Sequence, residues 1–252
     1  METKNNILEI KKLSKIYHTN KSEISAIKDL DLNIKEGEFV AIVGPSGCGK
    51  TTLLSILCGL EEKSSGDIIF PKDKLKVGYM LQTDTLFPWL NILDNCLLGL
   101  KVKKEINNEN IAKVKDYLTT YGLKDFIYKY PSNLSGGMKQ RVALIRTLAI
   151  DPDIILLDEP FSALDYQTRL TVSDDVWKII KKEKKTTIMI THDIAEAVSM
   201  ADRVIVLTDR PSKVKCEYEI IMNNKSTPMN NRNLEEFKYY YNKIWKDIDI
   251  HV

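Results

Sequence analysis

The sequence has few of the features that mark secreted or membrane-spanning chains. Its longest apolar runs, such as Ile154 to Leu157, are much too short to cross a bilayer. The start, Met1 to Asn6, contains no apolar stretch of the signal-peptide type. We therefore expect a soluble, cytosolic chain, and any role at a membrane would have to come from a partner.

Cysteine is equally scarce. The four cysteines have no Cys-x-x-Cys spacing, and no histidine lies close enough in sequence to suggest a zinc site. We expect reduced thiols, as in most cytosolic proteins. Cys48 alone has a chemically suggestive place, because it lies in a glycine-rich loop whose following helix could lower the pKa of a thiol. The sequence leaves open whether Cys48 is sensitive to redox conditions.

The chain also lacks an excess of either charge. Lys and Arg number 37 and Asp and Glu number 35, so the formal net charge is +2. Such a balance gives no large attraction to nucleic acid, and we expect no nucleic-acid partner. There are no internal repeats. The 252 residues suit one α/β domain with an inserted lobe, or two small domains.

The sequence does contain a complete phosphate-binding loop. It follows the buried-strand run 39–43 and reads Gly44-Pro45-Ser46-Gly47-Cys48-Gly49-Lys50-Thr51. Its glycines let backbone N–H groups surround a β-phosphate, and the next helix adds the positive end of its dipole. Lys50 would bridge the β- and γ-phosphates, and the Thr51 hydroxyl would bind Mg²⁺. The loop therefore predicts binding of ATP with Mg²⁺.

Two carboxylates, Asp158 and Glu159, follow the apolar run Ile154 to Leu157. Asp158 would hold Mg²⁺ through water, and Glu159 would face the γ-phosphate and polarise the attacking water. Phosphoryl transfer needs positioning and charge neutralisation more than covalent chemistry, so a carboxylate beside the metal suffices. Without the phosphate loop, two solvated carboxylates at a strand end would be the better interpretation.

Hydrophobic patterning predicts alternating strands and helices. Strands are expected at 39–43, 77–81, 154–157, 187–190 and 204–207, with a helix over 167–182. This alternation predicts a parallel sheet with helices on both faces. Residues 7–43 predict short strands with turns, and a helical block over 86–150 interrupts the alternation as an inserted lobe. A linker at 223–228 precedes a closing helix whose apolar face should pack on its own domain.

A second glycine-rich element opens another predicted helix. It reads Asn133-Leu134-Ser135-Gly136-Gly137-Met138-Lys139-Gln140-Arg141. A helix N-terminus with two glycines is suited to binding an anion, but its own phosphate loop already has ligands. Between the phosphate loop and the acidic strand, this element resembles the signature of the ABC-type ATPases. In that family the signature binds the γ-phosphate of a nucleotide held by a second subunit, so the resemblance implies a head-to-tail homodimer.

The resemblance implies further site residues. Thr52 would touch the α-phosphate, and Gln82 matches the family's glutamine loop, which reaches metal and water. His192, after the strand 186–191, resembles the switch histidine that contacts the γ-phosphate, although a lone histidine after a strand is usually structural. Tyr17 would stack on adenine, or simply pack in its strand. The run Ser162-Ala163-Leu164-Asp165 matches the family's dimer-crossing loop.

The resemblance also implies the fold. It is a P-loop NTPase core of the α/β class with a mostly parallel sheet, an N-terminal antiparallel β part and an inserted helical lobe. The whole chain, 1–252, would form one cassette. Residues 1–85 and 151–222 would make the core, 86–150 the helical lobe, and 223–252 a C-terminal linker and helix.

Finer features resemble the ATPases of nitrate, sulfonate and taurine importers. They are the segments 86–95, 191–197 and 201–207. The resemblance implies an ATP-hydrolysing subunit that drives permease subunits at the cytoplasmic face of the membrane and serves a solute-binding protein indirectly. Phe87 and Trp89 would receive a permease helix, or else pack inside the lobe. From its length we expect no regulatory domain of the kind that sugar-importer ATPases carry.

Two rival functions stay open. The first is the same role for a substrate such as a thiamine precursor, because those ATPases look alike. The second is a non-transport switch acting on nucleic acid or the ribosome. The stretch from Gln82 to Ser135 is short and has no heptad repeat, which argues against the DNA-repair relatives with long coiled coils. In a transporter of this kind the permease and binding protein would choose the transported substrate, so this chain does not specify it.

Overall fold

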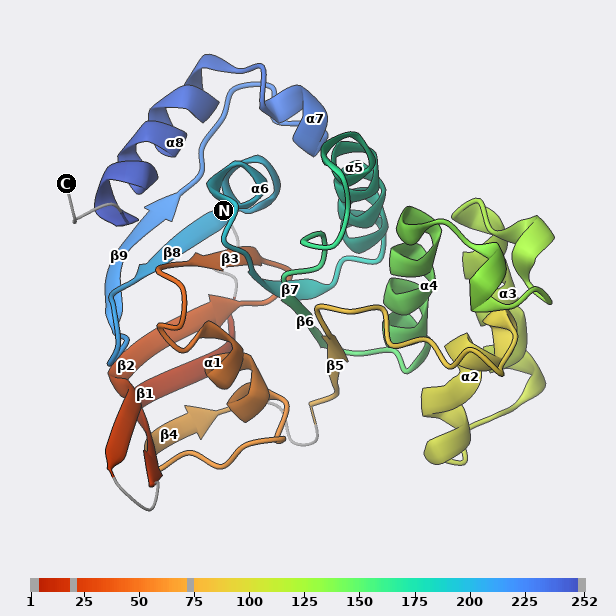
Figure 1. Ribbon diagram of the computed structural model, residues 1–252, viewed down its shortest axis with the longest axis horizontal. Coiled ribbons are helices and arrows are strands. Elements are labelled where there is room, and N and C mark those ends of the chain that lie inside the picture. The colour runs from red at the N-terminus through yellow and green to blue at the C-terminus, as the bar shows by residue number, and fades with distance from the viewer. Residues whose placement is uncertain (1–4, 19–21, 72–74, 249–252) are drawn as a thin grey trace.

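The computed structural model describes residues 5–18, 22–71 and 75–248 (Figure 1). The segment Met1 to Asn6 has no signal-peptide pattern in its sequence. Residues 1–4 of that segment lie outside the described residues. The described strands form two sheets, one of three strands and one of six.

The smaller sheet is antiparallel and has the strand order β2-β1-β4. Its strands are β1 (Asn6–His18), β2 (Glu23–Lys35) and β4 (Ser65–Ile69). β1 and β2 are longer than the short strands expected for this region, with 13 residues each. The pairing register shifts between Ile10 and Leu13, and Lys12 has a φ of 49°. Such bulges let a strand continue where its alternation of apolar and polar residues is broken.

The larger sheet has the order β5-β6-β7-β3-β8-β9, and only the pair β8–β9 is antiparallel. Its strands are β3 (Phe39–Val43), β5 (Val77–Met80), β6 (Ile154–Asp158), β7 (Thr186–Ile190), β8 (Arg203–Leu207) and β9 (Val214–Glu219). Every residue of β3, β6, β7 and β8 is buried, as expected of parallel strands covered on both faces. The predicted α/β fold with a mostly parallel sheet and an antiparallel N-terminal part is confirmed.

The helices divide between these sheets and one end of the molecule. They are α1 (Lys50–Leu57), α2 (Ile92–Val102), α3 (Asn108–Thr120), α4 (Gly136–Ala149), α5 (Tyr166–Lys182), α6 (Ile194–Met200), α7 (Pro228–Asn231) and α8 (Glu235–Ile248). Short 3-10 turns lie at Lys124–Phe126 and Pro131–Asn133. In Figure 1, α2, α3 and α4 lie together beyond the edge strand β5, and α4 faces α5.

Successive side chains of β3 point to opposite faces of the sheet and belong to two different hydrophobic cores. Val40 and Ile42 pack with α1 and the antiparallel sheet, whereas Phe39, Ala41 and Val43 pack with the helices of the other face. The closing helix α8 belongs to this second core, where its Ile244 is fully buried, as its spacing predicts. Among the described residues, no helix combines the length and apolar character needed to cross a membrane.

Candidate active site

The phosphate loop joins the end of β3 to the start of α1. Gly47 and Gly49 have φ values of 72° and 113°, which side chains other than glycine rarely adopt. The Lys50 ammonium donates hydrogen bonds to the carbonyl oxygens of Gly44 at 2.8 Å and Pro45 at 2.9 Å. The loop thus surrounds the ammonium group of Lys50. The first residues of α1 line the same cleft as the loop.

Asp158, the last residue of β6, is buried beside the first turn of α1. Its carboxylate accepts hydrogen bonds from the Thr51 hydroxyl at 3.3 Å and the Tyr79 hydroxyl at 3.0 Å. Burial raises the pKa of Asp158, and these two hydrogen bonds oppose that rise. A hydroxyl and a carboxylate oxygen are hard ligands of the kind that Mg²⁺ prefers. Among the described residues, no group of three or more His, Cys, Asp and Glu side chains offers a separate metal site.

Tyr79 is a site residue that sequence reasoning missed. The strand containing it was predicted, but not its hydrogen bond to Asp158. That contact follows from the parallel pairing of β5 with β6, which places Tyr79 beside Leu156. Strand order depends on long-range pairing, so no local signal in the sequence would have revealed it.

Glu159 has a strained backbone at the edge of the sheet. Its φ is 45°, which is uncommon for a residue with a side chain and typical of functional sites. The Glu159 N–H donates to the carbonyl oxygen of Ile190 at 2.9 Å, so β7 holds the strained residue in place. The Gln82 amide nitrogen lies 3.1 Å from Glu159 Oε2, and His192 Nδ1 lies 3.1 Å from the same oxygen. The three predicted catalytic residues therefore converge.

Glu159, His192 and the phosphate loop open onto one cleft of about 540 Å³, whose described lining does not include Gln82. The cleft is lined by Ser46, Gly47, Gly49, Lys50, Thr51, Thr52, Glu159 and His192. Its volume falls in the range of small-molecule sites, and its lining is rich in polar groups. The phosphate loop, the carboxylate and the histidine therefore face one space that can take a phosphate chain.

Tyr17 and Cys48 have weaker links to this cleft. The half-buried Tyr17 donates a hydrogen bond from its hydroxyl to Thr52 Oγ1 at 3.4 Å, which places the ring beside the predicted α-phosphate contact. The Cys48 thiol is buried, and burial raises its pKa. Because the thiolate is the reactive form, this environment disfavours oxidation of Cys48.

Ser135 lines a different hollow from the one that its own phosphate loop lines. Ser135 is the N-cap of α4 and accepts a hydrogen bond from the Met138 N–H at 3.4 Å. Ser135 and Gly137 line a separate hollow of about 540 Å³, whose described lining includes no residue of the phosphate loop. A Cβ on Gly137 would lie 2.6 Å from Val172 Cγ2, so this close approach of α4 to α5 requires glycine.

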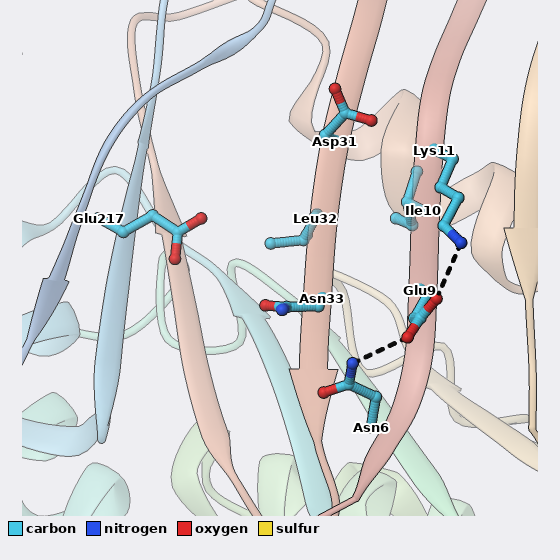
Figure 2. Close-up of a pocket in the computed structure, with 8 residues that line it drawn as sticks. All are labelled: Asn6, Glu9, Ile10, Lys11, Asp31, Leu32, Asn33 and Glu217. Carbon is cyan, nitrogen blue, oxygen red and sulfur yellow. Dashed lines mark hydrogen bonds and ion pairs between the residues drawn. The ribbon is translucent and has the colours of Figure 1, made fainter.

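Another hollow lies on the antiparallel sheet, outside the predicted site. Figure 2 shows its side chains, which come from β1, β2 and β9. It has a volume of about 400 Å³ and is lined by Asn6, Glu9, Ile10, Lys11, Asp31, Leu32, Asn33 and Glu217. Glu9 is already paired there with Asn6 and Lys11. None of these described lining residues belongs to the predicted nucleotide site.

Comparison with known proteins identifies the family. The model of the family described as "ABC transporter" matches residues 27–162. The chain is 40% identical over 248 residues to the uncharacterized ABC transporter ATP-binding protein YtlC of Bacillus subtilis, covering 96% of this chain and 95% of that protein. It is 34% identical to the aliphatic sulfonates import ATP-binding protein SsuB of Bacillus thuringiensis, covering 96% of each. It is 38% identical to the nitrate import ATP-binding protein NrtD of Synechocystis, covering 92% and 91%.

A solved structure agrees with this result. The ATP-binding cassette MJ0796, determined as a dimer in a post-hydrolysis state bound to ADP and Pi, superposes with a TM-score of 0.72. Its sequence is 34% identical, and the match covers 85% of this chain and 99% of that one. Membership in this family accounts for the occurrence of a phosphate loop, an acidic strand end and a second glycine-rich helix start in one chain. The chain therefore belongs to the ABC transporter family and is an ATPase of the ATP-binding cassette type.

Proposed function

We propose that the chain is the ATP-hydrolysing subunit of an uptake transporter and works as a head-to-tail homodimer. One observation carries this proposal. Lys50, Glu159 and His192 face one cleft, whereas Ser135 faces another hollow. The described lining of the first cleft includes the start of α1 but no residue from the start of α4, which the Ser135 region of a second copy can supply. The dimeric cassette MJ0796 supports this arrangement.

The chemistry assigned to the cleft is attack of water on the γ-phosphate of ATP. Lys50 would neutralise charge on the β- and γ-phosphates, and backbone N–H groups from Gly44 to Thr51 would surround them. Glu159 would orient and polarise the attacking water, with Gln82 and His192 fixing the carboxylate and the γ-phosphate. The hydrogen bond from Gln82 to Glu159 and the 3.1 Å approach of His192 Nδ1 to the same carboxylate support these roles.

Mg²⁺ fits the residues beside Asp158. Thr51 and Asp158 would hold the ion, Asp158 through water, and Gln82 would reach it from the glutamine loop. The 3.3 Å contact between the Thr51 hydroxyl and Asp158 supports this assignment, because two oxygen ligands already face the same point. When bound, Mg²⁺ would neutralise charge on the β- and γ-phosphates.

The remaining contacts would recognise the rest of the nucleotide. Thr52 would touch the α-phosphate, and Tyr17 would stack on adenine. Gly136 and Gly137 would present the start of α4, with Ser135, to the γ-phosphate held by the partner copy. The division into a core (1–85 and 151–222), a helical lobe (86–150) and a C-terminal part (223–252) stays a prediction.

The transported solute is proposed to be a small anion such as an aliphatic sulfonate, taurine or nitrate. Relatives named for import of these three solutes support the proposal. The chain would sit at the cytoplasmic face of the membrane, held there by permease subunits, with a solute-binding protein acting on the outer side. A thiamine-precursor substrate is the alternative, and a non-transport switch is less favoured because the named relatives are import proteins.

Purification with the permease from membranes tests the transport role. In lipid discs, we expect ATPase activity to rise when a binding protein loaded with a sulfonate or nitrate is added. A thiamine precursor on its own binding protein is the comparison, and empty binding protein is the control. A chain that never purifies with a permease, while binding nucleic acid or ribosomes in an ATP-dependent way, would contradict the transport proposal.

The segment after Gln82 is the proposed contact with the permease. Trp89 is 70% exposed, and its ring centroid lies 5.1 Å from that of Phe87. The buried Asn95 of α2 fixes the segment, since its side chain accepts from the Phe87 N–H at 2.8 Å and donates to the Leu90 carbonyl at 3.0 Å. A rigid loop that holds a large exposed aromatic side chain suits a protein contact.

Trp89→Ala should weaken permease binding and leave nucleotide binding intact. An apolar anchor in such a contact contributes about 2 kcal/mol or more, which corresponds to roughly a 30-fold weaker complex. Complex yield and uptake should fall, while ATP affinity of the isolated subunit stays the same. Trp245→Ala is the matched control, because Trp245 is 50% exposed on α8. Normal uptake and complex yield in Trp89→Ala would remove Trp89 from the docking site.

A further inference from the structure

Arg169 joins the dimer-crossing loop to the turn that carries His192. It lies in the first turn of α5, a few residues after the dimer-crossing loop 162–165. Its Nη2 donates a hydrogen bond to the Leu164 carbonyl oxygen at 3.0 Å, and its Nη1 lies 3.5 Å from Asp193 Oδ2. One guanidinium group thus contacts the loop that would meet a second subunit and the residue next to the switch histidine.

Glu196 provides the third contact of this group. The side chain is only 3% exposed, and its Oε1 lies 3.8 Å from Arg169 Nε. Its Oε2 accepts a hydrogen bond from the Thr191 hydroxyl at 2.7 Å, and Thr191 Oγ1 in turn accepts from the Asp193 N–H at 3.0 Å. Glu196 therefore holds the residues on both sides of His192.

The contact between Arg169 and Glu196 is incomplete in the single chain. Arg169 Nε is buried and has no hydrogen-bond partner, because 3.8 Å is too long for one. Buried N–H groups are nearly always bonded, so a short movement of Arg169 toward Glu196 would be favourable. Burial also raises the pKa of Glu196 to about 7, with Asp193 adding to the rise, so the carboxylate is not fully stabilised by its present neighbours.

We propose that Arg169 is a positioning residue that makes the placement of His192 depend on the dimer-crossing loop. A second copy that docks on residues 162–165 shifts the Leu164 carbonyl group, and Arg169 follows it. The Arg169 Nε–H then donates a hydrogen bond to Glu196. This bond fixes the turn 191–193 so that His192 faces the cleft. Hydrolysis is thereby tied to the assembled dimer. This inference rests on the proposed dimer and on the proposed role of His192.

Arg169→Met tests the link, because it keeps a long side chain and removes the charge and the donors. Misplacement of a reacting group by about 1 Å can slow a reaction on the order of 100-fold, so we expect kcat to fall by about 10- to 100-fold. KM for ATP should change by no more than roughly twofold, since the contacts of the phosphate loop with the nucleotide are untouched. Arg169→Lys should recover part of kcat. In a Glu159→Gln background, Arg169→Met should still dimerise with ATP.

A double variant and a matched control separate positioning from stability. Arg169→Met with Glu196→Gln should be no slower than Arg169→Met alone, because both changes break one contact. Arg232 also acts electrostatically on Glu196 but comes from the C-terminal segment, so Arg232→Met should keep kcat near that of the wild type. A joint loss of kcat, ATP-driven dimerisation and thermal stability in Arg169→Met would show a purely structural residue and overturn the inference.

His192→Ala distinguishes failure of the inference from failure of the proposed site. If His192→Ala is inactive and Arg169→Met hydrolyses ATP at the wild-type rate, only the link through Arg169 is wrong. If His192→Ala keeps full activity, the assigned role of the histidine is wrong and the inference falls with it.

Discussion

Glu159→Gln should abolish ATP turnover while ATP binding persists. The amide keeps the shape of the side chain and the strained backbone at φ 45°, but it removes the charge that polarises water. Loss of a general base typically costs about 100- to 10,000-fold in rate. Phosphate release should therefore fall to about 1% or less, whereas binding of a fluorescent ATP analogue stays near the wild-type level.

Two further variants serve as controls for this experiment. Lys50→Ala should lose ATP binding as well as turnover, because the ammonium is the cation enclosed by the phosphate loop. Glu219→Gln should behave as the wild type, since this exposed carboxylate lies on β9 and does not line the cleft. Near-normal hydrolysis in Glu159→Gln would reject Glu159 as the residue that activates water.

Ser135→Glu should block dimerisation of the Glu159→Gln protein. Without this change, Glu159→Gln should dimerise with ATP and dissociate with ADP, because Ser135 needs a γ-phosphate to bind across the interface. A carboxylate at the exposed start of α4 would face that phosphate. Juxtaposed like charges cost several kcal/mol, which corresponds to at least about a hundredfold weaker dimer. Light scattering with ATP measures the change directly.

Ser132→Glu is the matched control for this experiment. Ser132 is exposed in the 3-10 turn just upstream, so the same charge is added outside the helix start. It should leave the ATP-dependent dimer unchanged. The loss of the Ser135 cap itself costs about 1 kcal/mol of stability, so the melting temperature of Ser135→Glu must be measured alongside. Full dimerisation of Ser135→Glu would count against the clamp.

Local chemistry explains why much of this site could be predicted. The spacing of the phosphate loop, the carboxylates after an apolar strand and the glycine pair before α4 are short patterns in which each residue type has a physical reason. The family, the α/β fold and the ATPase assignment are confirmed. The convergence of Gln82 and His192 on Glu159 agrees with their predicted roles, which remain predictions.

The missed features depend on contacts distant in sequence. Tyr79 reaches Asp158 only because β5 pairs with β6, and Arg169 reaches Glu196 only because α5 and α6 pack together. The lengths of β1 and β2 were underestimated because bulges keep pairing intact where the apolar alternation breaks.

The separation of Ser135 from its own phosphate loop has a genetic consequence. In the proposed head-to-tail dimer, each composite site would take one half from each chain. A chain carrying Lys50→Ala and a chain carrying Ser135→Glu are each inactive alone. Paired together, they place both defects in one composite site and leave the other intact. If the proposed dimer is right, two null alleles of this gene should complement one another within a single mixed assembly.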